Sequence, residues 1–125
     1  MPKNILIVDD SVTLRSAAVF ALKRSGHTVY QAVDGLDGLE KIKEMEASSV
    51  DLNMMIVDVN MPNLDGFGFI RGVKKTSYKD VPILVLTTES QIDKKMIGKD
   101  AGATAWLVKP FKNQQLIDVV QQLAI

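Results

Sequence analysis

Short apolar runs alternate with longer amphipathic stretches along the chain. Residues 5–8, 54–57 and 83–86 are continuous apolar runs, each followed by polar residues. Runs of this length bounded by polar or turn residues are typical of strands buried on both faces, as in a parallel sheet. Two further strands are expected at 28–32, which carries polar residues as an edge strand does, and at 105–108.

Between these strands, apolar side chains recur at intervals of three and four residues, which predicts five helices. The first is expected between a cap at Ser11 and a stop at Gly26. Interior glycines weaken the third. The apolar sets of the five are Leu14, Ala17, Ala18, Ala21 and Leu22; Leu36, Leu39, Ile42 and Met45; Leu64, Phe67, Ile70 and Val73; Ile92, Met96, Ile97 and Ala101; and Leu116, Val119, Val120 and Leu123.

Strands and helices that alternate in this way predict an α/β fold. Parallel strands need crossover connections, and right-handed crossovers place helices on both faces of the sheet. The polar strand at 28–32 fits one edge, which gives the strand order 2-1-3-4-5. We therefore expect a doubly wound, five-stranded parallel sheet of the flavodoxin-like (βα)5 type.

Composition narrows the class of protein. The 125 residues are the size of one domain, so a single domain spanning 1–125 with no output domain is expected. The 15 basic and 15 acidic residues cancel, which gives no net attraction to nucleic acid or to an anionic membrane. Cysteine is absent, and no apolar run approaches the ~18 residues of a membrane span. These features predict a cytoplasmic protein.

Polar residues at the ends of the predicted strands carry the candidate chemistry. Asp9 and Asp10, Asp58, Thr87 and Lys109 all follow apolar runs, and the carboxyl ends of parallel strands meet at one edge. Neighbouring carboxylates repel by roughly 4 kcal/mol per pair at ~4 Å in an effective dielectric of ~20, so a cation must join them. Oxygen ligands without His or Cys favour Mg²⁺. An aspartate beside Mg²⁺, a lysine and a threonine hydroxyl can attack phosphorus and hold an acyl phosphate.

This pattern resembles the receiver domains of two-component response regulators, in particular the single-domain chemotaxis type. The likeness covers essentially the whole chain. It is carried by VDDS at 8–11, the run from Asp58 through Met61-Pro62 to Asp65-Gly66, Thr87, and Lys109-Pro110-Phe111.

The resemblance implies a role for each matching residue. Asp58 would be the phosphoacceptor. The Mg²⁺ ligands would be Asp9, Asp10, Asp58 and the backbone carbonyl of Asn60, and the phosphoryl group would be contacted by Lys109, Thr87 and the backbone N–H of Thr88. Asn60 and Glu89 would tune the lifetime of the phosphoryl group. The Lys109-Pro110 bond would be cis, as is typical of receivers.

The resemblance also implies partners and an output surface. A sensor histidine kinase would donate the phosphoryl group, a target would bind the face formed by the fourth helix, fifth strand and fifth helix, and a phosphatase could end the signal. The protein is expected to be a monomer that acts as a switch, and its only catalysis would be its own phosphorylation and autodephosphorylation. Helical spacing adds residues to this surface, because Ile97 and Ala101 would face the core and leave Ile92 and Met96, with Lys95 and Lys99, on a partly exposed face beside Trp106. Residues expected in switching and output are Thr87, Ile92, Lys95, Met96, Lys99 and Trp106.

Three positions depart from the family's usual residues. Trp106 replaces the usual Tyr or Phe, Thr88 replaces a small residue, and Gly68-Phe69 replaces an acidic or bulky pair. None of these positions takes part directly in the expected phosphoryl chemistry. The first two concern the coupling between phosphorylation and output.

Three other functions compete with the switch. A phosphatase of the haloacid-dehalogenase kind also forms an aspartyl phosphate. Such enzymes carry an Asp-x-Asp motif, whereas this chain has Asn60 at the position of the second acid. A flavin-binding module would need a phosphate-cradling loop after the first strand, where Asp9 and Asp10 would repel phosphate. A degenerate receiver used only for docking fits less well, because all the site residues are present.

Overall fold

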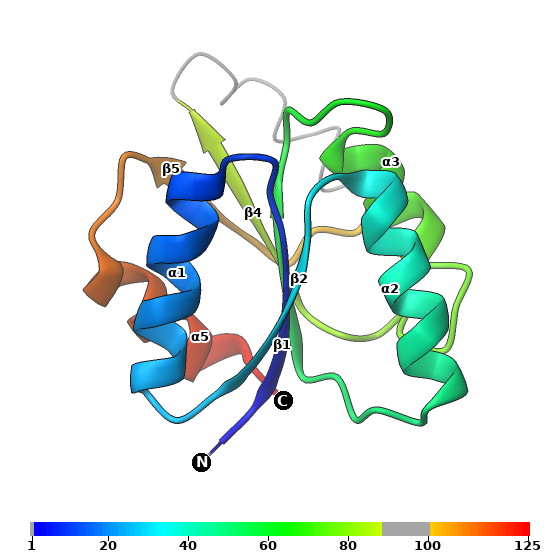
Figure 1. The fold of residues 1–125 in the computed structure, drawn as a ribbon, viewed down its shortest axis with the longest axis horizontal. Helices are drawn as coiled ribbons and strands as arrows, with labels where there is room; N and C mark the ends of the chain where they lie inside the picture. Colours follow the sequence, from blue (N-terminus) through cyan, green and yellow to red (C-terminus); the bar gives the residue numbers. More distant parts are fainter. Residues whose placement is uncertain (1, 89–100) are drawn as a thin grey trace.

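The computed structural model describes residues 2–88 and 101–125. It contains one sheet of five parallel strands in the order β2-β1-β3-β4-β5, as the sequence predicted. The polar strand β2 lies at one edge and β5 at the other (Figure 1). The strands are β1 (Asn4–Val8), β2 (Thr28–Ala32), β3 (Met54–Asp58), β4 (Ile83–Thr88) and β5 (Ala105–Lys109).

Helices cover both faces of the sheet, as a doubly wound fold requires. Figure 1 shows α1 and α5 on one face and α2 and α3 on the other. Their bounds are α1 (Val12–Arg24), α2 (Gly35–Ala47), α3 (Gly66–Val73) and α5 (Asn113–Leu123). The predicted fourth helix, with Ile92, Met96 and Ile97, lies outside the described residues, and Ala101 at its expected end is buried.

The sheet has a hydrophobic core on each face, which explains the continuous apolar runs. Along β1, Ile5 and Ile7 pack on the side of α1 and α5, whereas Leu6 and Val8 pack on the side of α2 and α3. The same alternation holds in β3. Because successive side chains point to opposite faces, a strand covered on both sides must be apolar at every position.

Polar caps start three of the helices at the carboxyl edge of the sheet. Ser11 Oγ accepts a hydrogen bond from the backbone N–H of Leu14 at the start of α1. Asp34 caps α2 and Asp65 caps α3 in the same way. The loops at this edge therefore have fixed ends, on which the candidate site is built.

The apolar faces of two helices differ from the predicted ones. In α2, Leu36 is 52% exposed, and the buried face is formed by Gly35, Gly38, Ile42 and Met45. A Cβ at Gly38 would lie 2.7 Å from the Phe69 ring, so the close approach of α2 and α3 through this glycine turns Leu36 outward. In α1, Ala17 is exposed and Val19 is buried instead.

Within the described part of the chain, no helix combines the length and apolar character needed to cross a bilayer.

Candidate functional site

Three acidic side chains meet at the carboxyl edge of the sheet. Asp9 and Asp10 follow β1, and Asp58 is the last residue of β3. One carboxylate oxygen from each lies within 4.8 Å of the other two. Asp9 is fully buried and Asp58 is 6% exposed, whereas Asp10 faces solvent. The structure therefore brings the predicted acids together in a cluster that opens on the side of Asp10.

Lys109 supplies a positive charge to this cluster from the end of β5. Its Nζ donates a hydrogen bond to Asp58 Oδ1 at 2.7 Å and lies 3.9 Å from Asp9 Oδ2. The lysine side chain is 22% exposed. One ammonium group cannot balance three carboxylates, so the cluster keeps a negative charge that a further cation would offset.

The backbone around Asp9 is held by several hydrogen bonds. Asp9 N–H donates to the Ala32 carbonyl at 3.1 Å, and Arg15 Nη1 donates to the Asp9 carbonyl at 2.6 Å. Ser11 N–H donates to Asp9 Oδ1 at 2.8 Å. By contrast, Asp9 Oδ2 is buried and has no hydrogen-bond partner among the described residues. A buried carboxylate oxygen left without a donor is poised to bind a cation.

Burial raises the pKa of both inner carboxyl groups. For Asp9 the Ser11 N–H opposes the effect of burial, and the nearby Asp58 adds to it. For Asp58 the Lys109 ammonium opposes burial through its hydrogen bond and its charge. Because burial without enough positive charge disfavours the ionised forms, a divalent cation would stabilise them.

The residues present fit Mg²⁺. The orphaned Asp9 oxygen and the two neighbouring carboxylates form an all-oxygen donor set, which hard cations prefer. Asn60 lies two residues after Asp58 in the β3–α3 connection and is exposed. Its carbonyl, named from the resemblance alone, stays a predicted ligand.

Thr87 and Thr88 end β4 beside the cluster. Thr87 is fully buried, and its Oγ1 donates to the Thr88 carbonyl at 3.3 Å. Thr88 pairs in register with Lys109 on β5. The two threonines and the lysine therefore lie on adjacent strand ends, and the Thr87 hydroxyl is hydrogen-bonded locally.

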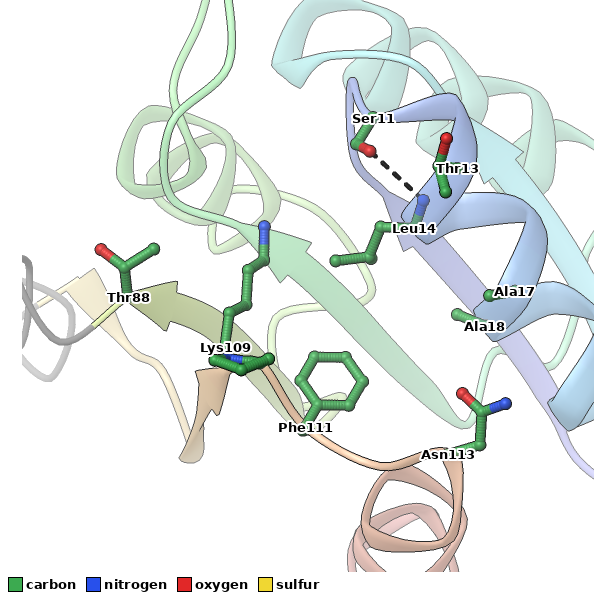
Figure 2. Close-up of a pocket in the computed structure, with 10 residues that line it drawn as sticks. Ser11, Thr13, Leu14, Ala17, Ala18, Thr88, Lys109, Phe111 and Asn113 are labelled. Carbon is green, nitrogen blue, oxygen red and sulfur yellow. Dashed lines mark hydrogen bonds between the residues drawn. The ribbon is translucent and has the colours of Figure 1, made fainter.

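A pocket of about 530 Å³ opens next to Lys109, between α1 and the residues that follow β5. Figure 2 shows Leu14, Ala17 and Ala18 of α1 on one wall and Lys109 and Phe111 on the other. Its lining is mostly apolar, and Thr88 also contributes to it. The Lys109-Pro110 peptide bond at its rim is cis, as the resemblance implied.

Of the predicted switch and output residues, only Thr87 and Trp106 are described. Trp106 is half-buried in β5, and its ring centroid lies 6.4 Å from that of Phe67, with the ring planes inclined at 60°. The remaining predicted residues, which are Glu89, Ile92, Lys95, Met96 and Lys99, lie outside the described residues.

Sequence reasoning missed two supports of the site. Arg15 holds the Asp9 carbonyl and also donates through Nε to Gln31 Oε1 at 3.3 Å. Asn63 donates to Asp34 at 2.8 Å and joins the loops that precede α2 and α3. The arginine one turn into a helix after the acid pair was a usable signal. The pairing of Asn63 with Asp34 depends on tertiary structure and left no local pattern.

The sheet order and the acidic cluster define a doubly wound α/β protein with a carboxylate cluster at its carboxyl edge that could hold a metal ion. The family profile of the response regulator receiver domain matches residues 5–121. The chain therefore belongs to the receiver domain family of the response regulators in two-component signalling.

Individual relatives agree with this assignment. PilG of Pseudomonas aeruginosa is 32% identical over 119 residues, which cover 94% of this chain and 84% of PilG. The response regulator MprA of a Mycobacterium species is 37% identical over 117 residues, but the chain spans only 48% of MprA. The structure of the Vibrio cholerae chemotaxis response regulator CheY4 superposes with a TM-score of 0.87 at 40% identity, covering 98% of this chain and 99% of CheY4.

Proposed function

We propose that this receiver accepts a phosphoryl group on Asp58 from the phosphohistidine of a sensor kinase. The observation that carries the proposal is the pairing of Asp58 with Lys109 inside a carboxylate cluster in which one buried oxygen accepts no hydrogen bond. This arrangement gives a nucleophile, a fixed positive charge beside it and ligands for a divalent cation.

The proposed transfer joins an Asp58 carboxylate oxygen to phosphorus while the phosphorus–nitrogen bond of the donor breaks. The departing imidazole nitrogen takes up a proton, and no electron transfer is involved. Asp9, Asp10 and Asp58 would hold Mg²⁺, which when bound neutralises charge on the phosphoryl oxygens. Lys109 would move from its bond with the carboxylate to the transferred phosphoryl group.

The signal would end when water attacks phosphorus and releases inorganic phosphate, which restores the Asp58 carboxylate. Asn60 is exposed beside the cluster, where it can affect the approach of this water. Glu89 has the same proposed role. The protein would act on no separate substrate, so its chemistry would be limited to its own phosphorylation and dephosphorylation.

Two partners complete the proposal. The apolar pocket beside Lys109 offers a surface on which the kinase domain that carries the phosphohistidine can dock. A target would then bind the output face, which includes β5 with Trp106 and α5. A chemotaxis pathway is favoured by the likeness to CheY4, which extends over nearly the full length of both chains.

The test is phosphorylation by a small-molecule phosphodonor, followed by intact mass measurement with Mg²⁺ and with a chelator. The parent should gain the mass of one phosphoryl group only with Mg²⁺, and the product should hydrolyse readily. Asp58→Asn should gain none. An Asp58→Asn protein phosphorylated as fully as the parent, or a parent that stays unmodified with Mg²⁺, would contradict the proposal.

A further inference from the structure

Two loops at the carboxyl edge are joined by a pair of hydrogen bonds. Asn63, in the β3–α3 connection, donates through Nδ2 to Asp34 Oδ2 at 2.8 Å. The backbone N–H of Gly35 donates to the carbonyl of Leu64 at 3.1 Å. These bonds, called here the loop clamp, join the start of α2 to the segment that follows Asp58.

Both carboxylate oxygens of Asp34 accept hydrogen bonds, one of them within the loop clamp. It is 8% exposed, and its other oxygen accepts the backbone N–H of Asp37 at 2.8 Å. The bonds from Asp37 and Asn63 lower the pKa of Asp34, so the group is ionised at neutral pH. Both oxygens are therefore used, one to cap α2 and one to hold Asn63.

The backbone at Asn63 shows that the clamp fixes an unusual conformation. Asn63 has φ of +69°, in the left-handed region that residues other than glycine seldom adopt. Asparagine tolerates this region better than most residues. From this backbone conformation, the Asn63 side-chain amide donates its hydrogen bond to Asp34.

The other end of the same loop is also fixed. Gly66 N–H donates to the Val59 carbonyl at 2.9 Å. A Cβ at Gly66 would lie only 2.3 Å from the backbone oxygen of Asp58, so the chain returns directly over the proposed phosphoacceptor. Residues 60–62, called here the arc, connect Val59 to the loop clamp at Asn63.

We propose that Asp34 and Asn63 are positioning residues that hold this arc so that the Asn60 carbonyl faces the cation held by the carboxylates. The inference rests on the proposed function, because it assumes that Mg²⁺ binds there. A loop fixed before the ion arrives loses little freedom when it binds, whereas a free loop must be ordered by the ion. The clamp therefore acts on Mg²⁺ affinity through the loop, without contact with the ion.

The experiment measures Mg²⁺ binding to the full chain by titration calorimetry, with no phosphodonor present. Asn63→Gly removes the amide but suits the left-handed backbone, and it should weaken Mg²⁺ binding by roughly three- to tenfold, less than the loss usual for a direct partner of a metal ligand. Asn63→Asp puts two carboxylates face to face and should also weaken binding. Its added negative charge alone would strengthen binding, so the direction of the change separates the two effects.

The exchange variant Asp34→Asn/Asn63→Asp supplies the matched rescue. It restores one amide and one carboxylate with the net charge of the parent, and asparagine caps helices about as well as aspartate. Mg²⁺ affinity should return to within about twofold of the parent, as expected for a restored pair. Glu46→Ala is the control, because it removes the bonds that Glu46 accepts from Ser77 and loosens α2 away from the site. It should lower the urea midpoint and leave Mg²⁺ affinity unchanged.

Parental Mg²⁺ affinity in Asn63→Gly and Asn63→Asp would overturn the inference, as would failure of the exchange variant to restore binding. Those results would leave the proposed function standing, because the parent would still bind the ion. A parent that binds no Mg²⁺ would instead overturn the proposed function and this inference together.

Discussion

The Lys109 ammonium lies 2.7 Å from a carboxylate oxygen of Asp58, although the two residues are 51 positions apart in the chain. The contact is made by the last residues of β5 and β3, which are separated in the sheet by β4. It places a positively charged side chain on the carboxylate that would be phosphorylated.

Lys109→Ala should keep Mg²⁺ binding but uncouple phosphorylation from the conformational response. The carboxylates would remain as ligands, whereas no ammonium would follow the phosphoryl group. We expect Trp106 fluorescence to respond to a phosphoryl mimic about fivefold less than in the parent, which is the lower range of allosteric coupling. Mg²⁺ titration serves as the control. A full Trp106 response in the variant would show that Lys109 is not needed for coupling.

Asp9→Asn should stabilise the protein in the absence of divalent cations. The substitution removes one charge from three crowded carboxylates and places an amide that can donate where Oδ2 accepts no hydrogen bond. We expect the free energy of unfolding in EDTA to rise by about 1–2 kcal/mol, within the range of a single stabilising substitution. Urea unfolding measures this change.

The same variant should lose its response to Mg²⁺. At ten times the dissociation constant, the ion should stabilise the parent by about 1.4 kcal/mol, because it binds only the folded chain. Asp9→Asn should gain almost nothing from the ion under these conditions. Equal Mg²⁺ stabilisation of both proteins would remove Asp9 from the ligand set.

Gly66→Ala should disturb both the fold and the site. The new Cβ would lie 2.3 Å from the Asp58 carbonyl oxygen, which is backbone and cannot turn aside. We expect the free energy of unfolding to fall by about 2–3 kcal/mol, at the upper end of the range for overpacking, and phosphorylation to be slower. Gly72→Ala is the matched control, because its Cβ meets the flexible Leu39 side chain and alanine favours the helix. Similar losses in the two variants would contradict the prediction.

The sequence was sufficient to predict the sheet order, because residues 5–8, 54–57 and 83–86 are apolar at every position and the strand at 28–32 is not. It also brought Asp9, Asp58 and Lys109 to one edge, since parallel strands share the direction of their carboxyl ends. The orientation of α2 about its axis, which exposes Leu36, was not predictable from periodicity. It depends on how closely Gly38 approaches Phe69, which is a property of two packed helices.

Glu46 should make the stability of the fold depend on pH below its ordinary pKa of 4.5. The hydroxyl and backbone N–H of Ser77 donate to its carboxylate and lower the pKa. A carboxyl group with a lowered pKa in the folded state stabilises the fold above its unfolded pKa, and this stabilisation is lost as the pH falls through the folded value. Acidification should therefore cost the parent more stability than Glu46→Gln, which has no charge to lose. Urea unfolding from about pH 6 to about pH 3 tests this, and parallel curves for the two proteins would refute it.

Trp106 leads us to expect that phosphorylation shifts the protein only partly toward its active state. The resemblance to receivers implies that Thr87 moves toward the phosphoryl group and vacates space for Trp106. Here the Thr87 hydroxyl is bonded to the Thr88 carbonyl, and the indole is already packed against Phe67. An indole is bulkier than the usual ring, so its inward packing should be incomplete. Moving a population from 1:99 to 99:1 takes about 5.5 kcal/mol of differential stabilisation, and a poorly packed indole would withhold part of it.

The backbone amide resonances of Thr87 and Thr88 would report the two states in solution. With Mg²⁺ and a saturating phosphoryl mimic, the parent should retain an inactive population of at least about one tenth, the fraction left when the stabilisation falls about 1.4 kcal/mol short of the full shift. Trp106→Tyr, with the smaller ring, should move further toward the active state under the same conditions. Asp58→Asn should not respond to the mimic and so controls for binding elsewhere. Complete conversion of the parent by the mimic alone would show that the indole packs inward fully, and that no target is needed to complete the switch.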